Sequence, residues 1–141
     1  MAIEIRDATQ EDLDYVIEYP INEAVTKDFK DVKIAGWAKT ALIDDIILGV
    51  GGCIVFWPGM AQGWYALSNH AEYNKIGVVR CLKEMIDLAF KELNLHRLET
   101  TIRSDFVQAQ KFIEYAGFEF EGTMRKYTED KKDAYLYALV R

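Results

Sequence analysis

The sequence has few of the residues that mark disordered, fibrous or disulfide-rich chains. Only two of its 141 residues are proline, and no segment is of low complexity or rich in proline and serine. Half of the residues are apolar, which is enough to bury a sizeable core, and the length suits one domain. We therefore expect a single folded domain over residues 1–141.

Cysteine is scarce. Cys53 and Cys81 each lie inside an apolar run, and neither belongs to a CxxC pair or has a histidine close by in sequence. This pattern gives poor support to a metal centre or to thiol catalysis, and we expect no metal site. Two buried free thiols are typical of proteins in a reducing compartment.

Long apolar runs and an excess of positive charge are also missing. No run approaches the roughly 18 apolar residues of a membrane span, and the N-terminus lacks the apolar region of a signal peptide. The net charge of −6 argues against a nucleic-acid partner, which needs a basic face. We expect a cytoplasmic protein that binds neither membranes nor nucleic acid. The negative charge is compatible with an amine substrate, although such charge usually serves solubility alone.

The hydrophobic periodicity predicts an α+β domain with three layers (α/β/α), in which helices flank a mixed, mostly antiparallel sheet. Thr9 is a candidate N-cap, and Gly117 is a candidate left-handed helix end. The two aspartates at 44–45 are expected to form the turn of a hairpin, and the segment 58–63 to form the next turn. The expected strands are 3–8, 37–44, 46–57, 64–68, 96–103 and two within 118–141, and the expected helices are 9–20, 21–29, one ending near Leu93, and 105–117.

The segment from Ser68 to Phe90 reads as a strand end, a short polar loop and a helix. This layout often holds a phosphate at the N-terminus of the helix. Such loops are normally rich in glycine, because the backbone must come close to the ligand. Here the loop has only Gly77, so it has the layout of a phosphate site without the usual composition.

Three segments, in order along the chain, resemble the Gcn5-related N-acetyltransferase (GNAT) superfamily, and most closely its ribosomal-protein N-acetyltransferase group. They are "ELNLHRLETTIRS" (92–104), "AQKFIEYAGFEFEGTMRKY" (109–127) and "DAYLYALVR" (133–141). The resemblance extends over nearly the whole chain. It implies a GNAT-like fold and transfer of an acetyl group from acetyl-CoA to an amine of a small molecule, a protein N-terminus or a lysine.

In this family a loop of pattern Arg/Gln-x-x-Gly-x-Gly/Ala holds the pyrophosphate of acetyl-CoA by its backbone N–H groups. "YNKIGV" (73–78) falls on those six positions and departs from the pattern at three of them. A shift by one residue would place Gly77 on the central glycine. The side chains at 76 and 78 threaten to crowd the pyrophosphate, and isoleucine disfavours a positive φ. The cofactor-binding positions that the resemblance implies are Ser68, Asn69, Tyr73, Asn74, Lys75, Ile76, Gly77, Val78 and Phe106.

The reaction also requires proton transfer, because the attacking amine must be neutral. His70 and Glu72 are the candidates for the general base, since an unperturbed imidazole titrates near neutral pH. His70 equally fits a surface histidine. The tyrosine that often protonates the departing thiolate in the family is replaced by Ile113, and an asparagine common in the family is replaced by Phe106.

Two functions therefore remain open from the sequence. One is an N-acetyltransferase; the other is a non-enzymatic GNAT-fold protein with a binding or structural role, similar to some bacteriophage gene products, including internal virion proteins. The sequence leaves both a monomer and a homodimer open. Acidic residues in the expected acceptor region suggest a cationic acceptor: Asp12, Asp14, Glu18, Glu23 and Glu129.

Overall fold

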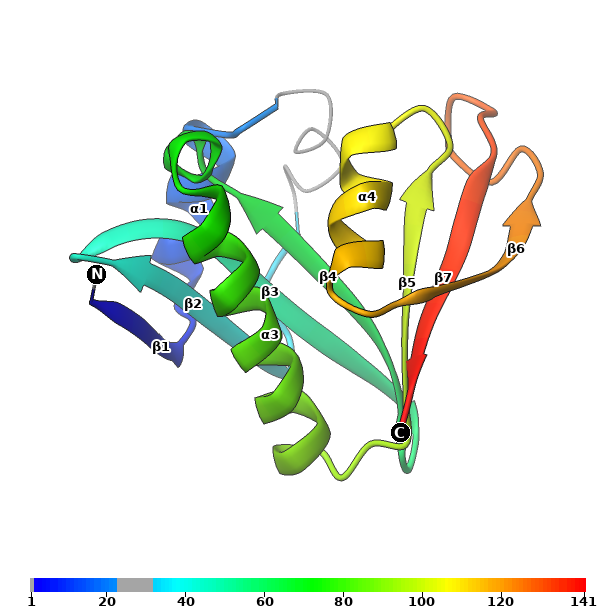
Figure 1. The fold of residues 1–141 in the computed structure, drawn as a ribbon, viewed down its shortest axis with the longest axis horizontal. Coiled ribbons are helices and arrows are strands. Elements are labelled where there is room, and N and C mark those ends of the chain that lie inside the picture. The colour runs from blue at the N-terminus through cyan, green and yellow to red at the C-terminus, as the bar shows by residue number, and fades with distance from the viewer. Residues whose placement is uncertain (1, 23–31) are drawn as a thin grey trace. The chain divides into compact units, whose positions relative to one another are not determined.

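The computed structural model describes residues 2–22 and 32–141 (Figure 1). These residues form two compact units: one takes the described residues up to Ile54 together with 64–88, and the other takes 55–63 together with 89–141. The helix expected over 21–29 lies largely outside the described residues. The elements are β1 (Ile3–Asp7), α1 (Gln10–Glu18), β2 (Trp37–Ile43), β3 (Ile46–Trp57), β4 (Met60–Leu67), the 3₁₀ turn η2 (Asn69–Tyr73), α3 (Lys75–Glu92), β5 (Arg97–Arg103), α4 (Val107–Tyr115), β6 (Glu119–Met124) and β7 (Ala134–Val140).

The strands follow the hydrogen-bonded order β1-β2-β3-β4-β5-β7-β6. Strand β1 pairs with β2 antiparallel, as do β2 with β3, β5 with β7 and β7 with β6, whereas β4 runs parallel to β5. The predicted α+β class with a mixed, mostly antiparallel sheet flanked by helices is therefore confirmed. The parallel β4–β5 pair needs a long crossover connection, and α3 supplies it.

In the first unit, the start of α1 follows from its first residues. The hydroxyl of Thr9 accepts a hydrogen bond from the Asp12 N–H at 3.2 Å, and the Asp12 carboxylate accepts one from the Thr9 N–H at 2.9 Å. This reciprocal capping box satisfies two backbone donors that the helix itself leaves free. The predicted N-cap at Thr9 is confirmed.

The hairpin of β2 and β3 is also as predicted. Asp44 and Asp45, at its turn, have φ values of 49° and 67°, and two successive left-handed residues match the right-handed twist of the strands. The strands are in register from Trp37 opposite Cys53 to Ile43 opposite Ile46, with one irregularity. Aspartate tolerates this conformation better than most residues, so the local sequence is sufficient to fix the turn.

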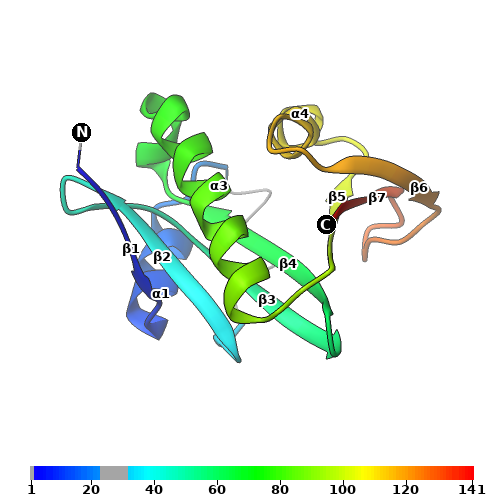
Figure 2. The same ribbon diagram turned by 60° about the horizontal axis from the view of Figure 1, so that its bottom comes forward.

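Two helices cover opposite faces of the first unit's sheet (Figure 2). On one face, Val50 of β3 packs with Leu13 and Val16 of α1. The next residue, Gly51, faces α3, and a Cβ atom built there would lie 2.8 Å from the Met85 Cε atom. Consecutive residues of β3 thus face opposite sides of the sheet. The backbone of β3 thus comes so close to α3 at Gly51 that it leaves no room for a side chain.

Strand β4 is longer than predicted. It begins at Met60, so only Pro58 and Gly59 remain in the turn, and the turn expected over 58–63 is wrong. The extra residues are ordered by pairing with β5, from Met60 opposite Arg97 to Gln62 opposite Glu99. These residues could not be predicted from the sequence pattern, because local periodicity gives no sign of a partner strand more than thirty residues away.

In the second unit, α4 ends as the sequence indicates. Gly117 has a φ of 103°, and the Phe118 N–H donates to the Ile113 carbonyl at 3.2 Å. Both Ile113 and Phe118 are buried. This left-handed end directs the chain from the helix into β6.

Candidate functional site

The candidate site lies at the first turn of α3, entirely within the first unit. The ladder of α3 begins with a hydrogen bond of 2.9 Å from the Val78 N–H to the Asn74 carbonyl. The N–H groups of Lys75, Ile76 and Gly77 precede it, so the helix offers them no acceptor. They also have no hydrogen-bond acceptor elsewhere among residues 2–22 and 32–141. Three successive backbone donors therefore stand at the positive end of an 18-residue helix.

The segment before the helix is held by hydrogen bonds within the unit. Ser68 is fully buried; its N–H donates to the Leu48 carbonyl at 2.8 Å and its hydroxyl to the Ile47 carbonyl at 2.7 Å. The Asn69 N–H donates to the Tyr19 carbonyl at 2.8 Å. A ligand amide can therefore bond to the N–H groups of Ser68 and Asn69 only by displacing these partners. This limits the cofactor contact that the resemblance implies for both residues.

The bulky residues of the loop are less obstructive than their sequence suggested. Ile76 lies in the helical first turn of α3, and φ is negative there, so the isoleucine is not forced into a left-handed conformation. Its side chain is 78% exposed, and that of Tyr73 is 86% exposed. Val78, by contrast, is buried with only 6% exposure, so its side chain belongs to the core. Neither isoleucine nor valine strains the loop backbone.

His70 is joined to α1. Its Nε2 atom lies 3.0 Å from the Tyr15 hydroxyl, and the two rings are parallel within 5°. The side-chain amide of Asn74 donates to the His70 carbonyl at 2.9 Å, which fixes the turn that carries the imidazole. His70 is half-buried and Glu72, two residues on, is exposed. Of the two candidate bases, His70 has a hydrogen-bonding partner that orients its ring.

The Asp12 side chain is not available to an acceptor molecule. It is buried, and its carboxylate receives both Arg6 Nη groups, at 2.7 and 3.1 Å, and the Thr40 hydroxyl at 2.8 Å. Burial alone would raise the pKa of this carboxyl, but the hydrogen bonds from Arg6, Thr9 and Thr40 and the charge of Arg6 lower it to about 2. The suggestion that Asp12 faces the acceptor is therefore wrong, and Glu23 of the same group lies outside the described residues.

The remaining site positions predicted from the family belong to the second unit. Phe106 is the residue before α4 and makes no side-chain cap; the Arg103 guanidinium lies 5.1 Å from its ring. Ile113 is buried at 2% exposure, at the position where many family members have a tyrosine. Tyr115 is 72% exposed. The side chain at 113 thus offers no proton for a departing thiolate.

Other kinds of chemistry have little support in the described part of the chain. No group of three or more potential metal ligands comes together there. Among the same residues, no helix combines the length and apolar character that a membrane crossing requires. Burial raises the pKa of the Cys53 thiol to about 11 and also raises that of Cys81, so both thiols are protonated at neutral pH.

Comparison with known proteins agrees with this geometry. Residues 66–135, which include the whole loop and α3, match a family model described as an acetyltransferase (GNAT) domain. The chain belongs to the GNAT superfamily. Members of this superfamily use acetyl-CoA as co-substrate and act on amine acceptors. The match does not extend to the ribosomal-protein group, which stays a prediction. No curated protein matches the chain in sequence.

Solved structures show the same fold over the full length. A GNAT-family acetyltransferase from Bacillus anthracis is 18% identical, with a TM-score of 0.73 over 99% of this chain and 95% of that one. A chimera of spermidine N-acetyltransferase SpeG from Vibrio cholerae and hSSAT is 15% identical, with a TM-score of 0.78 over 99% and 96%. Ard1 from Thermoplasma volcanium is 15% identical, with a TM-score of 0.77 over 99% and 98%. At such identities the likeness concerns the fold alone.

Proposed function

We propose that this GNAT protein is an acetyl-CoA-dependent N-acetyltransferase that acts on a primary amine. One observation carries the proposal: the N–H groups of Lys75, Ile76 and Gly77 are without acceptors in the described structure and stand together at the start of α3. They lie inside the segment that matches the acetyltransferase family model. Backbone donors at a helix start suit a diphosphate whatever side chains they carry.

The diphosphate of acetyl-CoA fits these donors on electrostatic grounds. The helix N-terminus carries a partial positive charge, and the exposed ammonium group of Lys75 adds a full one. The departures from the family's glycine pattern change side chains and leave the backbone donors in place. Acetyl-CoA supplies the activated acetyl thioester, while the protein supplies binding, orientation and proton transfer.

A substitution at Ile76 tests the backbone donors directly. Proline is tolerated in the first turn of a helix and lacks an N–H group, so Ile76→Pro should remove one donor and retain α3. A hydrogen bond to a charged group contributes about 1.5–3 kcal/mol, so the dissociation constant for acetyl-CoA should rise about 10- to 100-fold in calorimetric titration. Ile76→Ala is the matched control, because it removes the same exposed side chain and keeps the N–H. Equal affinities for the two variants would place the diphosphate elsewhere.

For the proton transfer we assign the role of general base to His70. Its Nε2 atom is engaged by Tyr15. If the hydroxyl of Tyr15 accepts the Nε2 proton, the lone pair of the neutral ring is on Nδ1, and Nδ1 is then the atom that removes the proton from the amine. Glu72 is the alternative base. The side chain of Ile113 cannot protonate the departing CoA thiolate. The thiolate therefore takes its proton from solvent, or takes the proton that the amine has lost.

The acceptor is proposed to be a cationic amine, either small or carried by a protein N-terminus or lysine. The net charge of −6 and the exposed carboxylates of Glu18 and Glu72 support a positively charged acceptor. Similar folds include proteins named as spermidine N-acetyltransferases. Parallel acetylation assays with spermidine and with a peptide carrying a free N-terminus and a lysine should favour one class. We further propose a cytoplasmic location.

The proposal as a whole is tested by binding. Acetyl-CoA should bind saturably in isothermal titration calorimetry and should raise the melting temperature of the protein through linkage. Coenzyme A without its acetyl group should bind with similar affinity, because the diphosphate contacts are the same. No saturable binding at millimolar ligand would reject the enzyme and favour the alternative, a GNAT-fold binding or structural protein of the kind found among bacteriophage products.

A further inference from the structure

The end of α1 is fixed beside the segment that carries His70. Just after the helix, Pro20 forms an antiparallel β-bridge with Ser68. Next to this bridge, the Asn69 N–H donates to the Tyr19 carbonyl at 2.8 Å. All of these residues belong to the first unit. The backbone of Tyr19 is therefore held against the residue that precedes His70.

Tyr19, Tyr15 and His70 form a row of rings, which we call the aromatic row. The centroids of the Tyr15 and His70 rings are 6.5 Å apart, and the centroids of the Tyr15 and Tyr19 rings are 5.1 Å apart, with a tilt of 46°. The Tyr19 N–H donates to the Tyr15 carbonyl at 3.0 Å, so the two tyrosines lie one helical turn apart on the same side of α1. The aromatic row thus runs from the proposed base to the end of the helix.

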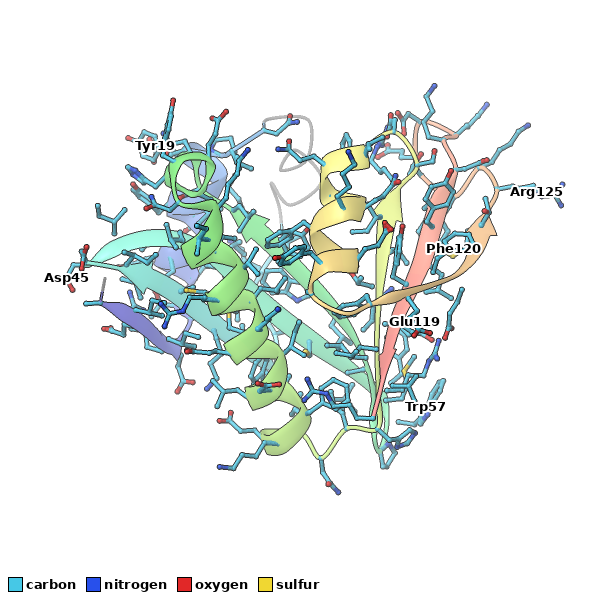
Figure 3. All side chains as sticks on the ribbon, viewed as in Figure 1. Tyr19, Asp45, Trp57, Glu119, Phe120 and Arg125 are labelled. Carbon is cyan, nitrogen blue, oxygen red and sulfur yellow. The ribbon has the colours of Figure 1, made fainter. Side chains whose placement is uncertain are left out.

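The outer end of the aromatic row is open to a ligand. The side chain of Tyr19 is 45% exposed, and Figure 3 shows it at the surface of the molecule. Among residues 2–22 and 32–141, no lysine or arginine side chain lies over its ring. The face of a tyrosine ring attracts cations, because its π electrons make it negative. Tyr19 can therefore receive the positive group of a ligand.

The charges around the aromatic row favour a cation as well. Glu18 directly precedes Tyr19, and Glu72 lies two residues after His70. Both carboxylates are exposed, and neither forms an ion pair within the described part of the chain. Such carboxylates raise the local concentration of cations, whereas a ring face binds a cation in one place. The aromatic row therefore gives a position to the charge that the carboxylates attract.

We propose that Tyr19 determines acceptor specificity: its ring binds a second positive group of the acceptor, while the amine that reacts lies at His70. This inference rests on the proposed acetyltransferase function and narrows the acceptor to an amine with a further cationic group, such as a diamine. The alkyl chain between the two groups lies along the ring of Tyr15. The ring spacings of 6.5 and 5.1 Å fix the length of the row, so acceptors with a matching chain should react best.

Acetylation kinetics with two matched amines test the effect of the charge. One is aminobutyl-trimethylammonium, whose second group is permanently positive. The other is its neutral isostere, in which a tert-butyl group replaces the trimethylammonium group. A cation–π contact should make kcat/KM about 2- to 30-fold higher for the cationic amine. This ratio should change along a series from the aminopropyl to the aminohexyl compounds, because the aromatic row has a fixed length.

Substitutions at Tyr19 separate the effect of the ring from that of the carboxylates. Tyr19→Phe keeps the ring and should keep the ratio of the two kcat/KM values. Tyr19→Leu keeps an apolar side chain without π electrons and should lower the ratio about 2- to 30-fold. Phe120→Leu is the control: Phe120 is also an exposed aromatic residue, but it lies on β6 in the second unit, so its loss should leave the ratio unchanged.

Calorimetric titration with acetyl-CoA distinguishes failure of this inference from failure of the proposed function. Tyr19→Leu should bind acetyl-CoA as the wild type does, because the Tyr19 carbonyl still accepts from Asn69. Equal kcat/KM values for the two amines, or an undiminished ratio in Tyr19→Leu, would overturn the role of Tyr19 and leave the acetyltransferase standing. Binding of acetyl-CoA without acetylation of any of these amines would also overturn it. A wild-type protein that does not bind acetyl-CoA would reject the proposed function, and this inference with it.

Discussion

A His70→Gln variant should bind acetyl-CoA with wild-type affinity and lose about 10²- to 10⁴-fold in kcat, which is the contribution usual for a general base. The reason is geometric. The Tyr15 hydroxyl 3.0 Å from Nε2 orients the imidazole, and the side chain of Asn74 holds the backbone that carries it. Glutamine keeps the size and the polarity of the side chain and removes its basic nitrogen. Steady-state acetylation kinetics and calorimetry on the same preparation separate the two effects.

Two further variants show whether His70 acts as the base and Tyr15 as its positioning residue. Glu72→Gln should leave kcat nearly unchanged. If kcat fell in Glu72→Gln and stayed normal in His70→Gln, the general base would be Glu72. Tyr15→Phe should lower kcat by less than His70→Gln and leave the KM for acetyl-CoA unchanged. It should also change the tautomer of His70, which the ¹⁵N shifts of the ring report. An unchanged tautomer would mean that Tyr15 does not orient the ring.

An Asp12→Ala variant should lose about 2–4 kcal/mol of unfolding free energy, because it removes half of the helix cap and leaves the buried Thr40 hydroxyl without its acceptor. The carboxylate of Asp12 receives hydrogen bonds from Arg6, Thr40 and the N-cap Thr9, and it joins β1, α1 and β2. Alanine would leave these donors without an acceptor and remove half of the capping box. The melting temperature should fall by roughly 10 °C in a thermal scan.

The pH dependence of this effect has a definite sign. The pKa of Asp12 is lowered from 3.8 to about 2 in the folded state, so its stabilisation is complete above about pH 4 and is lost as the pH falls towards 2. The stability difference between wild type and Asp12→Ala should therefore shrink in acid. Asp14→Ala, on the exposed side of the same helix, is the control and should cost under about 1 kcal/mol. Equal losses for the two variants would show that the Asp12 network adds little.

Features that depend on neighbouring residues could be predicted from the sequence. The capping box at Thr9, the turn at Asp44 and Asp45, and the left-handed end at Gly117 each need only a few adjacent residues. The helix expected to end near Leu93, which is α3, follows from the helical period of its apolar residues. The first residues of β4 were missed because their order comes from pairing with β5, and the 3₁₀ turn η2 was missed because short turns leave no periodic pattern.

The candidate site was predictable in part for the same reason. The layout of strand, loop and helix located the donors at 75–77, because any non-proline residue at a helix start supplies one. The partner of His70 was not predictable, since Tyr15 is 55 residues away in sequence. The role of Asp12 was misjudged because a helical acidic residue gives no sign in sequence of the arginine and threonine that bury it.

The division of the chain between the two units has a consequence during synthesis. Residues 55–63 belong with residues 89–141, which leave the ribosome later. The strands β1, β2 and most of β3 can pair as they emerge, whereas the tip of the β3–β4 hairpin must wait for β5. A nascent chain therefore displays an uncharged, aromatic hairpin for the time needed to translate α3. Its yield of native protein should depend on slow translation, low temperature or chaperones that shield this hairpin.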